Sequence, residues 1–453
     1  MSSPSATPSR IAEFPDDGPS ILDRILRAVS LTGFGILLFL GGVAVSIFGV
    51  FPAPLLQDAY NGGTALYAKW TQYQDITQTD LWMPARTDAR GVTILDSARV
   101  QPGYTLYSSG HEATAYLLAA DGTVVHQWHR PYSTVWAGSP PVRDPLPDQN
   151  IYFRRVWPFP NGDLLAIYEG AGDTPYGYGM VKLDRDSNVI WSYSGHTHHD
   201  FDVAADGRIF ALTHQNRHKA VPGLEHLAAT RLDDYLDILS PDGRLAKRVS
   251  LLEALADSPF VHLVHSVPAH SIADPMHVNA VKVLTPAMAE ALPGTEAGQV
   301  LLSLRNIGAL VVLDVERETV VWALRGPWYG QHDPDVLPNG NILIFDNVGN
   351  FKQPNGKSRV LEVDPRTVEI VWRYVGTGDM PLDSDIRADQ ERLANGNTLI
   401  NESNGGRVLE VTPTGEVVWE FVNPVRRGSD DEWIPIIAGA SHVETDFFQP
   451  GLF

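Results

Sequence analysis

Three histidines and one arginine lie at the starts of predicted strands, at corresponding places in separate repeats. Three of the four precede the Asn-Gly or Asp-Gly turn of their repeat by seven residues. They are Arg154, His199 and His332, and His277 begins the equivalent strand of a further repeat. Imidazole suits nucleophilic attack and proton transfer near neutral pH, and guanidinium offers a planar fork to anionic oxygens. Together these side chains predict a site for an anionic group.

Two further arginines, Arg305 and Arg359, are candidate forks for the same anion. Arg359 and Arg407 occupy the same place in consecutive repeats, so a structural role is an equal alternative for them. A single polar residue at a strand start is also more often a hydrogen-bonded structural residue than a catalyst. The convergence of several such residues is what favours a site.

Two histidine-rich segments have the spacing of metal ligands. They are HTHHD at residues 196–200 and HLVH at residues 262–265. Neither shows a complete ligand set, so we expect a structural or loop role for both, with no metal and no other cofactor.

Internal repeats position the candidate residues. Residues 331–376 and 387–424 are two copies of one unit that reads as four strands joined by tight turns, and weaker copies precede them. The last strand of a copy closes on a tryptophan, and the closing residues are Trp128, Trp191, Trp322, Trp372 and Trp419. The last two spacings are 50 and 47 residues, a period typical of a β-propeller.

Six such units predict an all-β fold, a six-bladed propeller over residues 103–425 with a C-terminal extension at 426–453. A closed ring removes the unpaired edges that a long open sheet would have. The first strand of each blade lines the centre of a propeller, so strand starts from different blades converge there. Inserts at 251–272 and 286–298 interrupt the period, and we expect them to form short helices or loops over one face.

An uncharged apolar segment near the N-terminus, residues 30–52, predicts a transmembrane helix after an N-terminal tail at 1–29. Arginines precede it and only Lys69 follows closely, so we expect a single-pass inner-membrane protein with a cytoplasmic N-terminus and a periplasmic or otherwise extracytoplasmic propeller. A cleaved signal peptide is the alternative. Residues 53–102 predict a juxtamembrane helix around 55–71 and a linker, which can contact a membrane-protein partner.

The composition excludes several other classes of protein. The 453 residues include 54 acidic and 34 basic side chains, for a formal charge of −20, which disfavours a nucleic-acid partner. The absence of cysteine excludes disulfides, thiolate metal sites and a cysteine nucleophile.

Residues 91–424 resemble the arylsulfotransferase (ASST-like) family of six-bladed propellers. The most specific segments are GYTLYSSG, DGTVVHQW, HHDFDV, DPMHVNAV, QHDPDVLPNGNILIFDN, SRVLEVD and RLANGNTLINES. The resemblance implies sulfuryl transfer from an aryl sulfate to a phenol in the periplasm, through a sulfated histidine and without a nucleotide donor. It also implies that His277, His332 and Arg359 bind the sulfuryl group.

The last repeat departs from the family pattern. The family's nucleophilic histidine belongs to the late part of the propeller, but the strand start at residues 388–390 has none. His199 and His442 are the candidates to replace it.

The leading hypothesis is therefore an arylsulfotransferase-like enzyme in which His277, His332 and Arg359 hold the sulfate oxygens. One of His199, His277 and His332 acts as nucleophile or acid, and Arg154, Arg305 and Asn279 bind substrate. A catalytically silent propeller that binds a ligand or scaffolds a membrane complex is the second hypothesis. A propeller hydrolase or lyase is the third.

Overall fold

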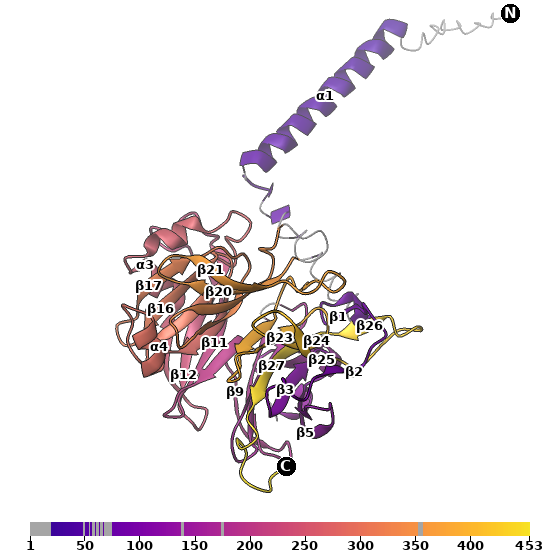
Figure 1. The fold of residues 1–453 in the computed structure, drawn as a ribbon. Coiled ribbons are helices and arrows are strands. Elements are labelled where there is room, and N and C mark those ends of the chain that lie inside the picture. The colour runs from indigo at the N-terminus through magenta and orange to yellow at the C-terminus, as the bar shows by residue number, and fades with distance from the viewer. Residues whose placement is uncertain are drawn as a thin grey trace, which may run out of the picture. The chain divides into compact units, whose positions relative to one another are not determined.

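The computed structural model describes residues 20–48, 50–53, 55–56, 59, 63, 67, 75–136, 140–173, 176–351 and 357–453. The chain divides into two units, Met1–Trp70 and Thr71–Phe453. The long helix α1 belongs to the first unit, and the strands belong to the second (Figure 1).

Helix α1 (Ile21–Phe48) carries charged residues only in its first two turns, at Asp23, Arg24 and Arg27, and none of its residues is buried. Ser20 caps its start, because Ser20 Oγ accepts the Asp23 N–H at 3.2 Å and the Asp23 carboxylate accepts the Ser20 N–H at 3.1 Å. This reciprocal cap places the start of the helix before the predicted segment 30–52. Its 28 residues, with a mean hydropathy of 2.2 in the most apolar window, can cross a membrane. Most of the predicted juxtamembrane helix at 55–71 lies outside the described residues.

The second unit is a six-bladed propeller, and each blade is a four-stranded antiparallel meander. The first blade comprises β27 (Ile437–Val443), β3 (Tyr104–Ser109), β4 (Thr114–Ala119) and β5 (Val124–His129). The second comprises β6 (Ile151–Pro158), β7 (Leu164–Gly170), β8 (Gly177–Leu183) and β9 (Val189–Tyr193). The third comprises β10 (Thr197–Val203), β11 (Ile209–His218), β12 (Thr230–Leu239) and β13 (Leu245–Ser250).

The other three blades follow the same plan. The fourth comprises β14 (Val278–Val283), β15 (Val300–Leu304), β16 (Ala309–Asp314) and β17 (Thr319–Arg325). The fifth comprises β18 (His332–Val336), β19 (Ile342–Asp346), β20 (Arg359–Asp364) and β21 (Glu369–Tyr374). The sixth comprises β22 (Asp389–Arg392), β23 (Thr398–Glu402), β24 (Arg407–Val411) and β25 (Val417–Val422), with β2 (Gly91–Leu95) as a fifth, outer strand.

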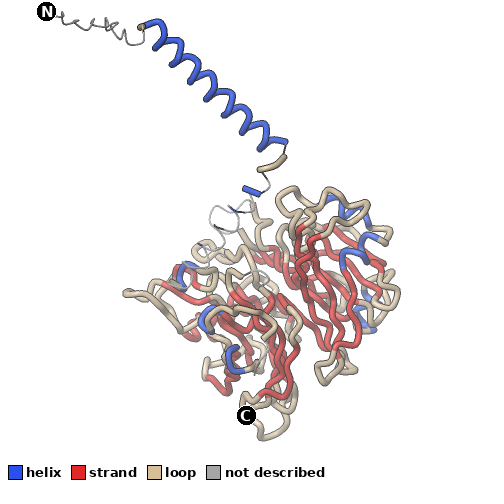
Figure 2. The backbone as a smooth tube through the Cα atoms, turned by 180° about the vertical axis from the view of Figure 1, so that it is seen from behind, coloured by secondary structure: helices blue, strands red, loops and turns tan. Residues whose placement is uncertain are grey.

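The first-named strand of each blade lies innermost. These inner strands contact one another in the order β27, β6, β10, β14, β18, β22 and back to β27, which closes the ring. Figure 2 shows from behind that strands and their turns make up most of this unit. The expected six-bladed, all-β fold with one apolar N-terminal helix is confirmed.

The ring closes through both ends of the propeller sequence. Strand β27 pairs with β3 in the first blade, and β2 pairs with β25 in the sixth. The predicted propeller boundaries at 103 and 425 are therefore wrong, because each leaves out a strand that covers an otherwise unpaired edge. The predicted C-terminal extension supplies the innermost strand of the first blade. It also supplies β26 (Trp433–Pro435), which pairs with β1 (Trp82–Pro84).

The closing tryptophans join each blade to the next. Trp128 Nε1 donates to the Gly162 carbonyl in the turn of the second blade at 2.9 Å, and Trp419 Nε1 donates to the Ala120 carbonyl of the first blade at 2.8 Å. Gly162 has a φ of +86°, which the turn requires and which favours glycine. The repeat period therefore sets the contacts that hold the ring together.

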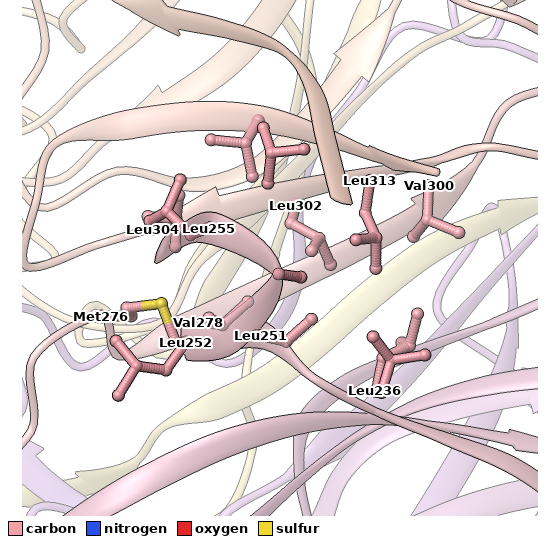
Figure 3. Close-up of a cluster of buried hydrophobic side chains, with 14 of the residues drawn as sticks. Leu236, Leu251, Leu252, Leu255, Met276, Val278, Val300, Leu302, Leu304 and Leu313 are labelled. Atoms are coloured by element: carbon pink, nitrogen blue, oxygen red, sulfur yellow. The ribbon is translucent and has the colours of Figure 1, made fainter. Parts of the chain in front are cut away.

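The short helices pack at the edges of the blades. They are η1 (Ile76–Gln78), η2 (Tyr132–Thr134), η3 (Asp148–Asn150), α3 (Leu251–Ala256), η4 (Val261–Ser266) and α4 (Pro286–Ala291). Helix α3, in the predicted insert 251–272, has four buried residues that belong to the apolar core between the third and fourth blades. Figure 3 shows Leu251, Leu252 and Leu255 among side chains of β14, β15 and β16. The insert thus adds to the core.

Candidate functional site

A cavity of about 300 Å³ lies where the inner strands begin, and we call it the central cavity. Its walls come from the second to sixth blades and from the segment before the first blade. The lining residues are Asp80, Tyr152, Arg154, Glu169, Gly170, Ala171, Gly172, Asp173, Tyr176, His199, His277, Arg305, His332, Ile386 and Arg387. Five of the seven residues that the sequence predicts for the site line this cavity: Arg154, His199, His277, Arg305 and His332.

The backbone at the strand starts is bent to direct these side chains. His199 and His277 have positive φ angles of 53° and 48°, as do Arg387 at 59° and Ala388 at 72°. Strands β10, β14 and β18 each have a bulge or register irregularity against their neighbouring strand. A left-handed conformation costs a residue with a side chain about 1–2 kcal/mol. Such strain is often found at functional sites, and the packing of the propeller maintains it here.

His332 is held as a neutral imidazole with one free ring nitrogen. Asn347 Nδ2 donates to the carbonyls of Ser384 and Arg387, so Asn347 Oδ1 is the acceptor that faces His332 Nδ1 at 2.8 Å. His332 Nδ1 therefore carries the hydrogen, and Nε2 keeps its lone pair. Burial lowers the pKa of His332 well below its usual value, and the charges of Arg305 and Arg154 lower it further.

His277 is paired with a carboxylate. Its Nδ1 lies 2.5 Å from Asp274 Oδ2, where the ring N–H donates. A carboxylate at this nitrogen stabilises the imidazolium that forms when Nε2 takes a proton, and it fixes the ring orientation. The His277 ring lies 4.9 Å from that of His199, centre to centre.

His199, in β10 of the third blade, lies near both of the other two imidazoles. Its ring centre is 6.5 Å from that of His332, and its Nδ1 is 2.8 Å from His198 Nδ1. Its backbone N–H donates to Glu169 Oε1 at 2.6 Å. Burial lowers the pKa of His199 well below its usual value, and the charge of His277 adds to this effect. His199 is therefore neutral in the free protein at neutral pH.

Three guanidinium groups make the cavity suitable for an anion. Arg154 Nη1 donates to the Ala438 carbonyl at 2.8 Å, and Arg305 Nη1 donates to Asn306 Oδ1 at 3.3 Å. Within the described part of the chain, the Nε of Arg154 and the Nε of Arg305 have no hydrogen-bond partner. Arg387 is paired with Asp80 at 2.7 Å. Arg154 Nε also lies 3.8 Å from Glu169 Oε2, so Arg305 is the one of the two without a carboxylate partner among the described residues. Both guanidinium groups line the cavity and suit anionic oxygens that enter it.

A model of the arylsulfotransferase (ASST) family matches residues 156–424 of the chain. The chain belongs to the arylsulfotransferase family. The match includes His199, His277, Arg305 and His332, whereas Arg154 lies just before it.

Three solved structures match the chain at low sequence identity. A protein of unknown function from Bacteroides caccae is 12% identical, with a TM-score of 0.46 over 75% of this chain and 98% of that one. A streptogramin B lyase is 9% identical, with a TM-score of 0.40 over 79% and 94%. A catalytically inactive virginiamycin B lyase from Staphylococcus aureus with quinupristin is 11% identical, with a TM-score of 0.36 over 62% and 73%. Likenesses of this size say nothing about a shared activity. No curated protein matches the chain.

Arg359, which the resemblance to arylsulfotransferases implies as a sulfuryl-binding residue, does not line the central cavity. Its Nε pairs with the buried Asp346 at 2.6 Å and its Nη2 donates to the Pro327 carbonyl at 2.6 Å. Arg407 makes the equivalent pair with Glu402 in the next blade. The structural alternative for Arg359 and Arg407 therefore accounts for both, since each neutralises a carboxylate buried in its own blade.

Asn279 and His442 also lie away from the central cavity. Asn279 Nδ2 donates to the Gln331 carbonyl at 2.8 Å, and the residue borders a much smaller adjoining space with Asp200 and Asp389. His442 lies in β27, where its backbone N–H donates to Glu391 at 2.9 Å. His199 and His332 also line the space that Asn279 borders, whereas His442 lines neither space.

Arg387 is the main charged residue of the central cavity that the sequence did not predict. It directly precedes Ala388, which occupies the place of His332 in the repeat, and the positive φ at both residues brings Arg387 into the cavity. Its Nε lies 3.2 Å from the Tyr152 hydroxyl, which donates to Glu169 at 2.8 Å. The sixth blade thus supplies a guanidinium where no histidine stands.

Proposed function

We propose that this protein is a membrane-anchored arylsulfotransferase that moves a sulfuryl group from an aryl sulfate to a phenol through a sulfated histidine. The observation that carries the proposal is the meeting of three imidazoles with Arg154 and Arg305 in one cavity of about 300 Å³. Sulfuryl transfer needs hydrogen-bond donors for three anionic oxygens and a nucleophile with a free lone pair, and the cavity supplies both.

Arg154 and Arg305 bind the sulfuryl oxygens in this proposal. Their guanidinium groups line the cavity and supply charge-assisted hydrogen bonds, and the buried walls raise the strength of these bonds relative to water. Charge that develops on the sulfuryl oxygens during transfer is stabilised in the same way. This is the role that fixed cationic groups have in phosphoryl transfer.

His332 is the proposed nucleophile. Its Nε2 lone pair attacks sulfur, the N–S bond forms and the S–O bond to the aryl group breaks. Asn347 holds the Nδ1 hydrogen of His332 at 2.8 Å, which keeps the lone pair on the attacking nitrogen. The departing phenolate takes a proton from Nε2 of the His277 imidazolium, whose positive charge Asp274 stabilises.

The second half of the reaction reverses these roles. The first phenol leaves, and an acceptor phenol enters and gives its proton to His277. The acceptor oxygen attacks sulfur, the N–S bond breaks, and its electron pair returns to His332 Nε2. Because donor and acceptor use the same cavity in turn, the proposal predicts ping-pong kinetics.

The membrane location is part of the proposal. Helix α1 serves as a single-pass anchor, and the arginines at its N-terminal end, Arg24 and Arg27, favour a cytoplasmic N-terminus and an extracytoplasmic propeller. A donor that needs no nucleotide suits a compartment without nucleotide sulfates.

The test is turnover of 4-methylumbelliferyl sulfate by the purified full-length chain in detergent, with and without phenol. We expect release of the fluorescent phenol to depend on the acceptor and phenyl sulfate to form in equal amount. Release of inorganic sulfate without an acceptor dependence would instead favour the hydrolase alternative. No turnover by a folded sample would favour the non-catalytic binding or scaffold alternative.

A further inference from the structure

A second cluster of reactive side chains lies in the third blade, next to His199 but separate from the central cavity. His198 of β10, His214 of β11 and Asp234 of β12 lie side by side, with the two imidazole rings stacked at 4.5 Å between centres. Each offers one ligand atom, these atoms lie within 4.8 Å of one another, and all three residues are buried. Neighbouring strands of one sheet hold them, so the arrangement is rigid.

The facing atoms lack partners. Among the residues that the structure describes, His198 Nε2, His214 Nδ1 and Asp234 Oδ1 are each buried with no hydrogen-bond partner. The other polar atoms of these side chains are engaged, since Asp234 Oδ2 accepts the Val278 N–H at 2.9 Å and His198 Nδ1 lies 2.8 Å from His199 Nδ1. Three unsatisfied atoms that face one another in a dry interior call for a shared partner.

We propose that His198, His214 and Asp234 bind one divalent transition-metal ion, for which Zn²⁺ is the best-suited representative. Two imidazole nitrogens and one carboxylate oxygen form a donor set that zinc takes, with a fourth position left for water. The distance from His198 Nε2 to Asp234 Oδ1 is 3.5 Å. A tetrahedral zinc with bonds of about 2.0–2.2 Å separates its ligand atoms by about 3.4 Å, which agrees with this edge.

The metal also resolves a charge problem. Asp234 lies close enough to Asp274 for the two carboxylates to repel each other inside the protein. A divalent ion at the cluster compensates both charges. Asp274 in turn holds His277 Nδ1 at 2.5 Å, so the metal stabilises the carboxylate that orients a cavity imidazole.

The metal determines where His199 carries its hydrogen. When His198 Nε2 binds the ion, the hydrogen of His198 lies on Nδ1 and donates to His199 Nδ1. His199 then carries its own hydrogen on Nε2, where it can donate to an anionic oxygen in the cavity. On the other side of the ion, the 3.3 Å contact from the Gly177 N–H to His214 Nε2 opens, because that nitrogen then carries the hydrogen. The metal ligands therefore act on the cavity as positioning residues.

The test is the metal content of the full-length chain, purified in detergent without chelators and measured by mass spectrometry of the elements. We expect about one equivalent of a transition metal per chain. After removal with a chelator, added Zn²⁺ should restore one equivalent and raise the melting temperature. His198→Gln and Asp234→Asn should each abolish the bound equivalent and the shift in melting temperature.

Two controls make the result decisive. His226→Gln changes a histidine that stacks on His265 at 4.9 Å outside the cluster, and it should retain the metal. His332→Ala should lose sulfuryl transfer and retain the metal, so failure of the transfer proposal is separable from failure of this one. If the wild-type chain holds no metal and Zn²⁺ leaves its melting temperature unchanged, an ordered water fills the cluster and the proposal is overturned.

Discussion

The central cavity and the charged residues that follow it along the same inner strands differ in how fully their groups are paired. We call the second region the channel cluster; it comprises Arg155, Asp200, Lys282, Asp333, Asp335, Asp389 and Glu391. Both of its cations are paired with carboxylates, with Arg155 3.2 Å from Asp200 and Lys282 2.9 Å from Asp335. In the cavity, by contrast, Arg305 has no ion-pair partner among the described residues, and the hydrogen bonds found there for His332 are made by Nδ1.

Burial acts on both regions and favours uncharged forms in each. It lowers the pKa of His199 and His332, and it raises the pKa of Asp200 to about 6 and of Glu391 to about 7. The neutral imidazole of His332 keeps a lone pair for nucleophilic attack, whereas carboxyl groups of the channel cluster are engaged by Arg155, Lys282 and backbone N–H groups. The comparison therefore assigns the chemistry to the cavity and the cohesion of the ring to the channel cluster.

Removing the proposed nucleophile is the change with the largest expected effect. His332→Ala should lower transfer from 4-methylumbelliferyl sulfate to phenol by about 10⁴-fold or more, since loss of a nucleophile removes the covalent route. Initial rates check this, with circular dichroism as a measure of folding. His442→Gln is the matched control in β27, and it should keep the wild-type rate. Equal losses in both variants would contradict the assignment.

Substitution of Arg305 and of Arg359, the two candidate sulfuryl-binding arginines, should affect different properties of the protein. Arg305→Ala should lower transfer by about 10²–10³-fold, as for the loss of one charge-stabilising donor. Arg359→Ala should leave the rate within a few-fold and lower the free energy of unfolding by roughly 3 kcal/mol, because Asp346 loses the partner of its buried charge. Rates and denaturant titrations of the two variants measure both effects. The reverse pattern would restore Arg359 as the sulfuryl-binding residue.

Loss of the Asp274 carboxylate, which pairs with His277, should slow transfer most for aryl sulfates with poor leaving groups. Asp274→Asn should slow transfer from phenyl sulfate by about 10²-fold, because His277 loses support for its imidazolium form. Transfer from p-nitrophenyl sulfate should slow much less, since nitrophenolate leaves without a proton. A series of aryl sulfates with different leaving groups gives the dependence. The same loss for every donor would show that Asp274 has a general structural role.

The channel cluster should affect stability against pH rather than catalysis. Burial raises the pKa of Glu391 from 4.5 to about 7, so the fold binds its proton more tightly than the unfolded chain does. This contribution to stability, about 3 kcal/mol, is complete below pH 4.5 and is lost as the pH rises to 7 and above. In urea titrations, the stability of the wild type relative to Glu391→Gln should fall across this window, and the variant should keep transfer within about two-fold. The comparison with the variant is needed because the lowered pKa values of His199 and His332 change stability in the opposite direction. A difference between the two proteins that rises over this window would contradict the prediction.

The sequence predicts the blades and most of the candidate cavity residues, because both follow from the internal repeats. The turn spacing placed His199 and His332 correctly, since the strand start lies a fixed number of residues before each turn. The approach failed at Arg387, where a positive φ shifts the cavity-facing position by one residue. The prediction for Arg359 differs from the structure for another reason. A sequence motif does not show whether its arginine binds a ligand or pairs with a buried carboxylate.

The ring closure was equally hard to predict. Strand β27 has no turn or closing tryptophan to mark it as part of a repeat, and its partner β3 lies more than 300 residues away in the sequence. Only the need to cover an inner edge of the first blade indicates that such a strand exists. The cluster of His198, His214 and Asp234 shares this feature, because its residues come from three successive strands and have no common motif.

The most direct test of the account is the mass of the intact chain after brief incubation with 4-methylumbelliferyl sulfate in the absence of a phenol. The account predicts one added sulfuryl group, mapped by peptide analysis to His332, absent from His332→Ala and removed by phenol. An adduct on His199, His277 or another residue would contradict the assignment of the nucleophile. Turnover without any adduct would contradict the covalent mechanism itself.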